Sequence, residues 1–305
     1  MSRSGWCRVR PSRVRLVAFA ILCLASVALA RGEEARPGGK SFLWKVRSKT
    51  ATAYLLGSIH LLKRDMYPLD GKIEEAFERS GVLVVESDVR GGAGGERQQR
   101  MLEGAVYPPG DTIGNHVSKE TLDLLTRKFP QLSLDRVGRL KPWVLAMTIA
   151  VMEYQKMGLD YDHGIDVYFL SKAKDGKRVR EIEGADSVIA MLNGFSDELQ
   201  DLFLLYTLLD LDEIGEKTER ILRAWSAGDP AAMEEIITES LRERPRLLPV
   251  FDALFHRRNE NMAGKIEGYL KEEGQFFVVV GAGHLVGEKG IVERLRRKGF
   301  TVDQQ

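Results

Sequence analysis

The chain contains, near its two ends, the segments Tyr54-Leu-Leu-Gly-Ser-Ile-His60 and Val278-Val-Val-Gly-Ala-Gly-His284. Each is an apolar run followed by Gly-x-x-His and then a leucine. A short apolar run that ends in glycine is typical of a buried strand leaving its sheet. The histidine beyond it then projects into the crevice where open α/β sheets bind ligands. The two segments therefore predict a paired-histidine site assembled from both ends of one domain.

A carboxylate follows a third apolar strand, Val82-Leu-Val-Val-Glu86. Together, His60, Glu86 and His284 would suit a divalent transition metal such as zinc, manganese or cobalt, with a coordination position left for water. Glu86 would be either a ligand or a general base, and the sequence leaves both roles open. The structural alternative is that the histidines only support glycine turns and that Glu86 is an exposed strand end or a helix-dipole partner.

Periodicity places strands at both ends of the chain and helices in the middle. The predicted strands are Phe42–Arg47, Thr52–Leu56, Val82–Glu86, Lys177–Ile182, Phe276–Val280 and Phe300–Val302. The predicted helices are Gly71–Arg79, Lys119–Lys128, Pro142–Lys156, Ile165–Lys174, Ala185–Leu192, Asp197–Trp225, Ala231–Leu241, Leu247–Lys271 and Gly290–Lys298, and Arg90–Glu96 is a glycine-rich loop. We expect an α/β fold whose mixed central sheet is built from both ends of the chain, flanked by helices, with a helical insertion roofing the crevice.

The N-terminus has the pattern of a secretory signal peptide over residues 1–30, with arginines before an apolar run and a cleavage site after Ala30. We therefore expect a periplasmic or secreted protein. The alternative is an uncleaved membrane anchor over residues 16–30, although this run is shorter than the roughly 20 residues that a spanning helix needs. Residues 31–41 are predicted to be a flexible leader and residues 42–305 the folded domain.

Composition limits the function further. With 305 residues, 44% of them apolar, the chain can bury a large core. Cys7 and Cys23 both lie in the predicted signal peptide, so the mature chain would have no disulfide or thiol chemistry. Removing the five arginines of that segment leaves 40 basic residues against the 44 acidic ones, a formal charge of −4. Because no basic stripe appears, nucleic acid is not an expected partner.

Two further motifs have competing interpretations. The run Gly281-Ala-Gly283 with Gly287, followed by Asp303, is similar to a dinucleotide-binding fingerprint, but the chain ends two residues after Asp303. The run Asp160-Tyr-Asp-His-Gly-Ile-Asp166 departs from the spacing of a calcium loop. Here Asp162 or His163 is expected to cap the next helix, while a substrate contact through His163 or Asp166 is the functional alternative.

Arg258 and Asn259 belong to a charged run on the last long predicted helix. Such a run usually forms a solvated face, but a guanidinium and an amide could also meet a carbonyl or anionic group of a substrate if the helix borders the crevice. His116 and His256 are expected to be surface or packing residues.

In these segments the chain resembles the TraB/GumN family, which is related to the Tiki metalloproteases. The matching pieces are Leu56-Gly-Ser-Ile-His60, the strand ending in Glu86, His163-Gly-Ile-Asp166, Arg258-Asn-x-x-Met262 and Gly281-Ala-Gly-His284. The resemblance implies a mixed sheet between helices, a metal held by His60, Glu86 and His284, and substrate support from Arg258 and Asn259. The chain lacks His-Glu-x-x-His, so no independent peptidase motif supports cleavage.

Tiki-like members look like metal-dependent peptidases, whereas TraB-like members are associated with inhibiting or sequestering peptide pheromones. Together, the N-terminal pattern and this resemblance imply a periplasmic or secreted metal-dependent hydrolase that acts on peptides. The first alternative is a non-catalytic protein that binds a peptide or another small molecule in the same crevice. A nucleotide-binding oxidoreductase is the second alternative.

Overall fold

The computed structural model describes residues 39–88, 104–173 and 176–305. Within them, six strands form one sheet in the order β4-β3-β5-β2-β1-β6. The strands are β1 (Leu43–Arg47), β2 (Ala51–Ser58), β3 (Val82–Val85), β4 (Arg178–Glu181), β5 (Gly274–Gly281) and β6 (Thr301–Gln304). The predicted signal peptide, both cysteines and the glycine-rich loop lie outside the described residues.

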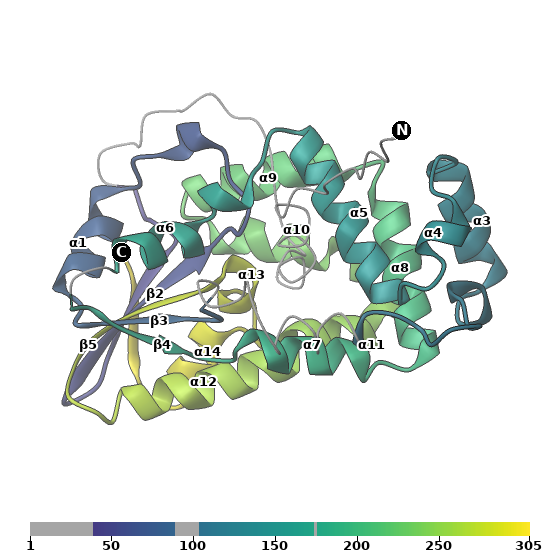
Figure 1. Cartoon of the computed structure of the whole chain (residues 1–305). Helices are drawn as coiled ribbons and strands as arrows, with labels where there is room; N and C mark the ends of the chain where they lie inside the picture. Colours follow the sequence, from purple (N-terminus) through teal and green to yellow (C-terminus); the bar gives the residue numbers. More distant parts are fainter. Residues whose placement is uncertain (1–38, 89–103, 174–175) are drawn as a thin grey trace, which may run out of the picture.

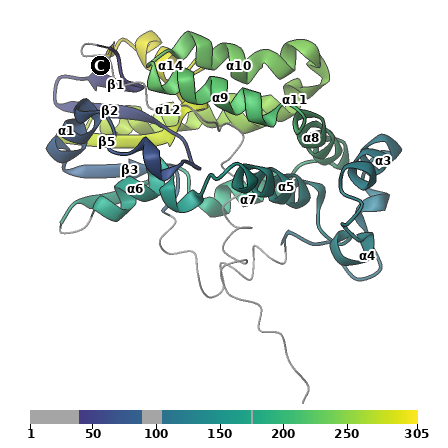
Figure 2. The ribbon, with the colours of Figure 1, turned by 90° about the horizontal axis from the view of Figure 1, so that it is seen from above.

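Helices cover the sheet and extend well beyond it. The main helices are α1 (Gly71–Arg79), α3 (Lys119–Lys128), α4 (Leu134–Val137), α5 (Pro142–Lys156), α6 (Ile165–Lys172), α7 (Ala185–Asn193), α8 (Asp197–Asp210), α9 (Ile214–Ser226), α10 (Pro230–Glu243), α11 (Leu248–Phe251), α12 (Arg257–Tyr269), α13 (Ala282–Leu285) and α14 (Ile291–Arg297). Short 3-10 helices are η3 (Arg64–Met66), η5 (Ile113–Asn115), η6 (Tyr161–His163) and η7 (Pro245–Leu247), and η8 (Asp252–His256) is a π-helical turn. Figures 1 and 2 show the sheet at one end of the molecule and α3, α4, α5 and α8 at the other.

The three strands that lead to the predicted site are parallel neighbours. Ser58 of β2 lies opposite Gly281 of β5, and Val85 of β3 lies opposite Val279 of β5. Their carboxyl ends therefore meet at one edge of the sheet. β1 pairs antiparallel with β2 and β6 pairs antiparallel with β1, so the sheet is mixed. The predicted α/β fold, with a sheet built from both ends of the chain, is confirmed.

Two hydrophobic clusters form among the residues that the structure describes. One surrounds the sheet and includes Leu55 and Phe277, both fully buried; the other lies among the middle helices around Trp143 and Phe203. The strands β3 and β5 are apolar without alternation because helices or neighbouring elements cover both faces of these central parallel strands. No helix in the described part of the chain is long and apolar enough to cross a membrane.

The prediction of one helix over Asp197–Trp225 was wrong. The structure divides it into α8 and α9 at residues 211–213. Lys217 pairs with both Asp210 and Glu213 at 3.1 Å, which ties the start of α9 back across the turn. The break allows α8 to pack against α5 while α9 packs against α10.

Candidate metal centre

His60, Glu86 and His284 come together at the carboxyl ends of the three parallel strands. His60 lies two residues after β2, Glu86 directly follows β3, and His284 lies in α13 after β5. Their exposed fractions are only 6%, 1% and 5%. The Nε2 atom of His60 lies 3.7 Å from one oxygen of Glu86, and the Nε2 atom of His284 lies 3.5 Å from the other. The two rings thus present the same nitrogen to one carboxylate.

The outer nitrogens of both rings are held by other side chains. The Nδ1 atom of His60 lies 2.6 Å from Asp166, whose second oxygen accepts a hydrogen bond from Ser58. The Nδ1 atom of His284 lies 2.6 Å from the Asn259 amide oxygen, and the Asn259 amide nitrogen donates to the Lys289 carbonyl. Since an ionised carboxylate and an amide oxygen only accept, both histidines donate from Nδ1, and the Nε2 atom is the nitrogen turned toward Glu86. Metal-ligating histidines are oriented in this way.

Glu86 is held from both sides. Arg258 donates to one oxygen at 2.8 Å, and the backbone amide of Gly281 donates to the other at 3.0 Å. Arg258 also donates to Glu183 at 2.9 Å and to the Leu254 carbonyl at 3.1 Å. The Arg258 guanidinium is therefore committed to the groups that surround the centre.

The prediction that Arg258 and Asn259 belong to a solvated face was wrong. They are 7% and 2% exposed, whereas the neighbouring Arg257 side chain is 75% exposed and pairs with Asp252. The turn η8 precedes them, with the Arg257 amide donating to the Asp252 carbonyl five residues earlier. One extra residue in a helical turn rotates the residues after it, and such π-turns are frequent at functional sites.

Burial and nearby charges set the protonation of the centre. Burial lowers the pKa of His284 well below its ordinary value, and Arg258 and His60 lower it further. Burial raises the pKa of Glu86, although Arg258 opposes this. Burial also lowers the pKa of His60, but the charge and hydrogen bond of Asp166 outweigh it and the net shift is upward. His284 is therefore a neutral imidazole at neutral pH, with a lone pair available to a cation.

The residues fit a divalent cation. Arg258 pairs with Glu86 and Glu183, and Asp166 pairs with His60. When all three carboxylates are ionised, their negative charge exceeds the single positive charge of Arg258 by two. A Cβ atom on Gly281 would lie 3.3 Å from the His60 Nε2 atom and 3.5 Å from a Glu86 oxygen, so glycine keeps the space beside these donors clear. Donor atoms of His60, Glu86 and Asp166 all lie within 4.8 Å of one another.

The segment around His163 supports His60 from behind. The Ile165 amide donates to the Ile59 carbonyl, and a Cβ atom on Gly164 would lie 2.2 Å from the His60 carbonyl oxygen. Asp160 caps η6, and α6 begins after Gly164 without a side-chain cap, so the prediction that Asp162 or His163 caps this helix was wrong.

The His163 backbone oxygen accepts from Tyr67, and its side chain lines a separate surface cavity with Arg64. Substrate contacts by His163, Asp166, Arg258 and Asn259 stay predictions.

The dinucleotide alternative is contradicted by the order of the strands. A dinucleotide-binding unit places its second strand beside the first, but β2 and β1 lie between β5 and β6. The Gly281 amide donates to Glu86, and Asp303 pairs with Arg47 at the surface.

Glu183 and Ser58 also belong to the centre, although neither was predicted as a site residue. Glu183 lies two residues after β4, as His60 lies two residues after β2, so its place after a strand was the available signal. Ser58 lies within the first Gly-x-x-His motif itself. His116 and His256 pair with aspartates outside the centre, as expected for surface or packing residues.

The chain is similar to several known proteins. Uncharacterized protein YbaP of Escherichia coli (strain K12) is 28% identical over 246 residues, which are 80% of this chain and 87% of YbaP. An uncharacterized protein of Treponema pallidum (strain Nichols) is 23% identical over 324 residues, 98% of this chain and 94% of that protein. Metalloprotease TIKI1 of Homo sapiens is 22% identical over 320 residues, 86% of this chain and 61% of TIKI1. No solved structure matches significantly. A sequence model of the TraB/PrgY/gumN family matches residues 42–304, and the chain therefore belongs to that family.

Proposed function

We propose that the protein is a metal-dependent hydrolase that cleaves peptides in the periplasm or after secretion. One observation carries the proposal: the Nε2 atoms of two buried histidines face the two oxygens of Glu86, while Asp166 and Asn259 hold their Nδ1 atoms. The choice of a peptide substrate rests on the relatives named metalloproteases.

In this proposal His60, Glu86 and His284 hold a zinc, manganese or cobalt ion, each of which accepts imidazole and carboxylate ligands. When bound, the ion would supply Lewis-acid polarisation of the scissile carbonyl group. Asp166 and Asn259 fix the orientation of the rings through hydrogen bonds to Nδ1. Oriented ligands of this kind need no rearrangement when the ion arrives.

Glu86 has a second possible role as a general base. Burial raises its pKa, which suits a group that takes a proton from water near neutral pH. The variant Glu86→Gln separates the roles, because it keeps the shape and the contact with Arg258 but removes the charge. If Glu86 is the general base, the variant should keep the metal and lose turnover. If Glu86 is a ligand, the variant should lose affinity for the metal.

The metal content of the purified protein tests the proposal. We expect about one ion per chain in the wild type and in a His116→Ala/His256→Ala control, which removes two histidines outside the centre. A folded His60→Ala/His284→Ala variant is expected to lose the ion. Metal retained in this variant, or no uptake by the wild type after incubation with zinc, manganese and cobalt, rejects the metal centre.

Peptide turnover separates hydrolysis from sequestration. The proposal predicts that the metal-loaded protein converts members of a peptide mixture to fragments, seen by mass spectrometry, and that a chelator stops this. Peptide binding that survives the chelator, with no fragments formed, would support the alternative of a binding protein.

A further inference from the structure

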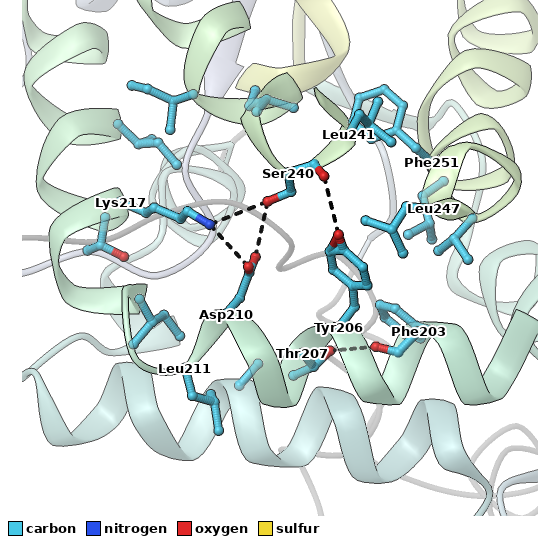
Figure 3. A pocket seen from close by; sticks show the side chains of 18 of the residues that line it. Phe203, Tyr206, Thr207, Asp210, Leu211, Lys217, Ser240, Leu241, Leu247 and Phe251 are labelled. Atoms are coloured by element: carbon cyan, nitrogen blue, oxygen red, sulfur yellow. Dashed lines mark hydrogen bonds and ion pairs between the residues drawn. The ribbon is translucent and has the colours of Figure 1, made fainter. Parts of the chain in front are cut away.

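A cavity of about 160 Å³ lies among the middle helices, beside the candidate metal centre. Figure 3 shows its side chains, contributed by α8, α9, α10 and the segment around α11. Most are apolar, among them Phe203, Ile221, Leu247 and Phe251. Ligand sites in proteins are typically concave, mostly apolar and lined by a few polar groups.

The polar groups in this cavity already have partners. Lys217 pairs with Asp210 at 3.1 Å and donates to Ser240 at 3.3 Å, and the Tyr206 hydroxyl donates to the Ser240 carbonyl. The Thr207 hydroxyl donates to the Phe203 carbonyl. Because these charges are balanced within the wall, a charged ligand would be desolvated without gaining a partner. The cavity therefore favours a neutral, apolar occupant.

The cavity and the metal centre share a wall. Phe255 lines the cavity, and its ring centre lies 5.2 Å from that of His284. A Cβ atom on Gly283 would lie 3.0 Å from both Phe255 and Ile237, another lining residue. Leu254 also lines the cavity, and its carbonyl accepts from Arg258. One layer of side chains thus separates the cavity from the centre.

We propose that this cavity is the specificity pocket of the site and receives one large apolar side chain, phenylalanine or leucine, of a peptide held at the metal centre. This inference rests on the proposed function. An apolar cavity of about 150 Å³ takes up benzene, which has the size of the phenylalanine ring. An extended peptide advances about 3.4 Å per residue, and a single layer of side chains that includes Phe255 lies between His284 and the cavity, so the occupant would be a side chain close to the scissile bond.

Peptide binding tests the pocket independently of cleavage. The probes are labelled six-residue peptides of alanine and serine that carry one phenylalanine, leucine, alanine or glutamate, and fluorescence anisotropy gives each Kd. Since one methylene group in an apolar pocket changes selectivity about 10- to 200-fold, we expect phenylalanine and leucine peptides to bind at least about tenfold more tightly than the alanine peptide. The glutamate peptide should bind no better than the alanine peptide.

The variant Ala150→Phe fills the cavity from α5, and Met152→Phe is its control, adding the same ring to an exposed position of that helix. We expect Ala150→Phe to lose the preference for apolar side chains and Met152→Phe to keep it. Equal Kd values for the four peptides in the wild type, or an unchanged preference in folded Ala150→Phe, overturns the inference.

A second measurement covers the case in which Ala150→Phe does not fold. Toluene is expected to raise the melting temperature of the wild type and of Met152→Phe in a saturable manner, and no shift would overturn the inference. The two proposals fail differently: cleavage without side-chain preference rejects only the pocket, whereas preferential binding without cleavage rejects only the hydrolase.

Discussion

The neighbouring arginines of α12 offer a matched test of how the centre is held together. Arg258→Met removes a buried guanidinium that contacts Glu86, Glu183 and the Leu254 carbonyl. Methionine keeps most of the apolar volume, so the main loss is the charge. The control Arg257→Met removes an exposed guanidinium whose ion pair is with Asp252, itself at the surface of the helix.

The expected magnitude depends on burial. Breaking a buried ion pair from one side costs about 3–5 kcal/mol, because the other charges stay buried without compensation. Here Glu86 is 1% exposed and the Glu183 side chain 11%. For a protein of this size each kcal/mol shifts the melting temperature by roughly 2–4 °C, so Arg258→Met should melt at least about 6 °C below the wild type. An exposed pair is worth about 0–1 kcal/mol, so Arg257→Met should stay within a few degrees.

Urea unfolding followed by circular dichroism gives both free energies, and thermal melts give the temperatures. A loss of stability in Arg258→Met no larger than that in Arg257→Met would refute this reasoning. In that case, water or another side chain would compensate the negative charges of Glu86 and Glu183 in the variant.

The same geometry leads to three further predictions. Asp166→Asn should weaken the affinity for cobalt about 10- to 100-fold, measured by competition with a chelator, because it weakens the hydrogen bond that orients His60 through Nδ1. The control Asp252→Asn changes the partner of His256, which lies outside the centre, and should leave the affinity unchanged. Gly281→Ala should lower metal content by crowding the donors, whereas Gly264→Ala, where an added Cβ meets nothing within 4 Å, should leave metal content unchanged and raise stability by about 0.4–1 kcal/mol. Burial lowers the pKa of His116, but hydrogen bonds to Asp197 and Asp111 outweigh burial, and the net shift of the pKa is upward. The stability that protonated His116 contributes is therefore present below its ordinary pKa of 6.5 and is lost as pH rises through the raised pKa. In His116→Gln, the free energy of unfolding measured in urea should change less with pH across that window.

Much of the site could be predicted because its residues come directly after apolar strands. An apolar run followed by glycine marks a strand end, and β2, β3 and β5 are parallel neighbours, so their carboxyl ends bring His60, Glu86 and His284 together. The helical middle was less predictable. Periodicity continues through residues 211–213, where side-chain pairing of Lys217 with two acids accompanies a break that the apolar pattern does not mark.

The burial of Arg258 could not be predicted from the sequence for a different reason. Its neighbours in sequence are charged, so the run has the composition of a solvated face. The Arg258 guanidinium is buried because the π-turn precedes it and because Glu86 and Glu183, which follow β3 and β4, both accept hydrogen bonds from it. Long-range pairing of this kind leaves no local periodic signal, because the partners lie far apart in the chain.

The two glycines of Gly281-Ala-Gly283 explain why the motif is similar to a phosphate-binding turn without being one. Neither has a positive φ, so both serve close approach rather than an unusual backbone conformation. A Cβ atom on Gly281 would meet His60 and Glu86, whereas one on Gly283 would meet Phe255 and Ile237. Gly281 thus clears the space beside His60 and Glu86, and Gly283 lets His284 pack against the wall of the apolar cavity. Because the ring centres of Phe255 and His284 lie 5.2 Å apart, we expect a ligand that displaces Phe255 from the cavity wall to change the packing of His284.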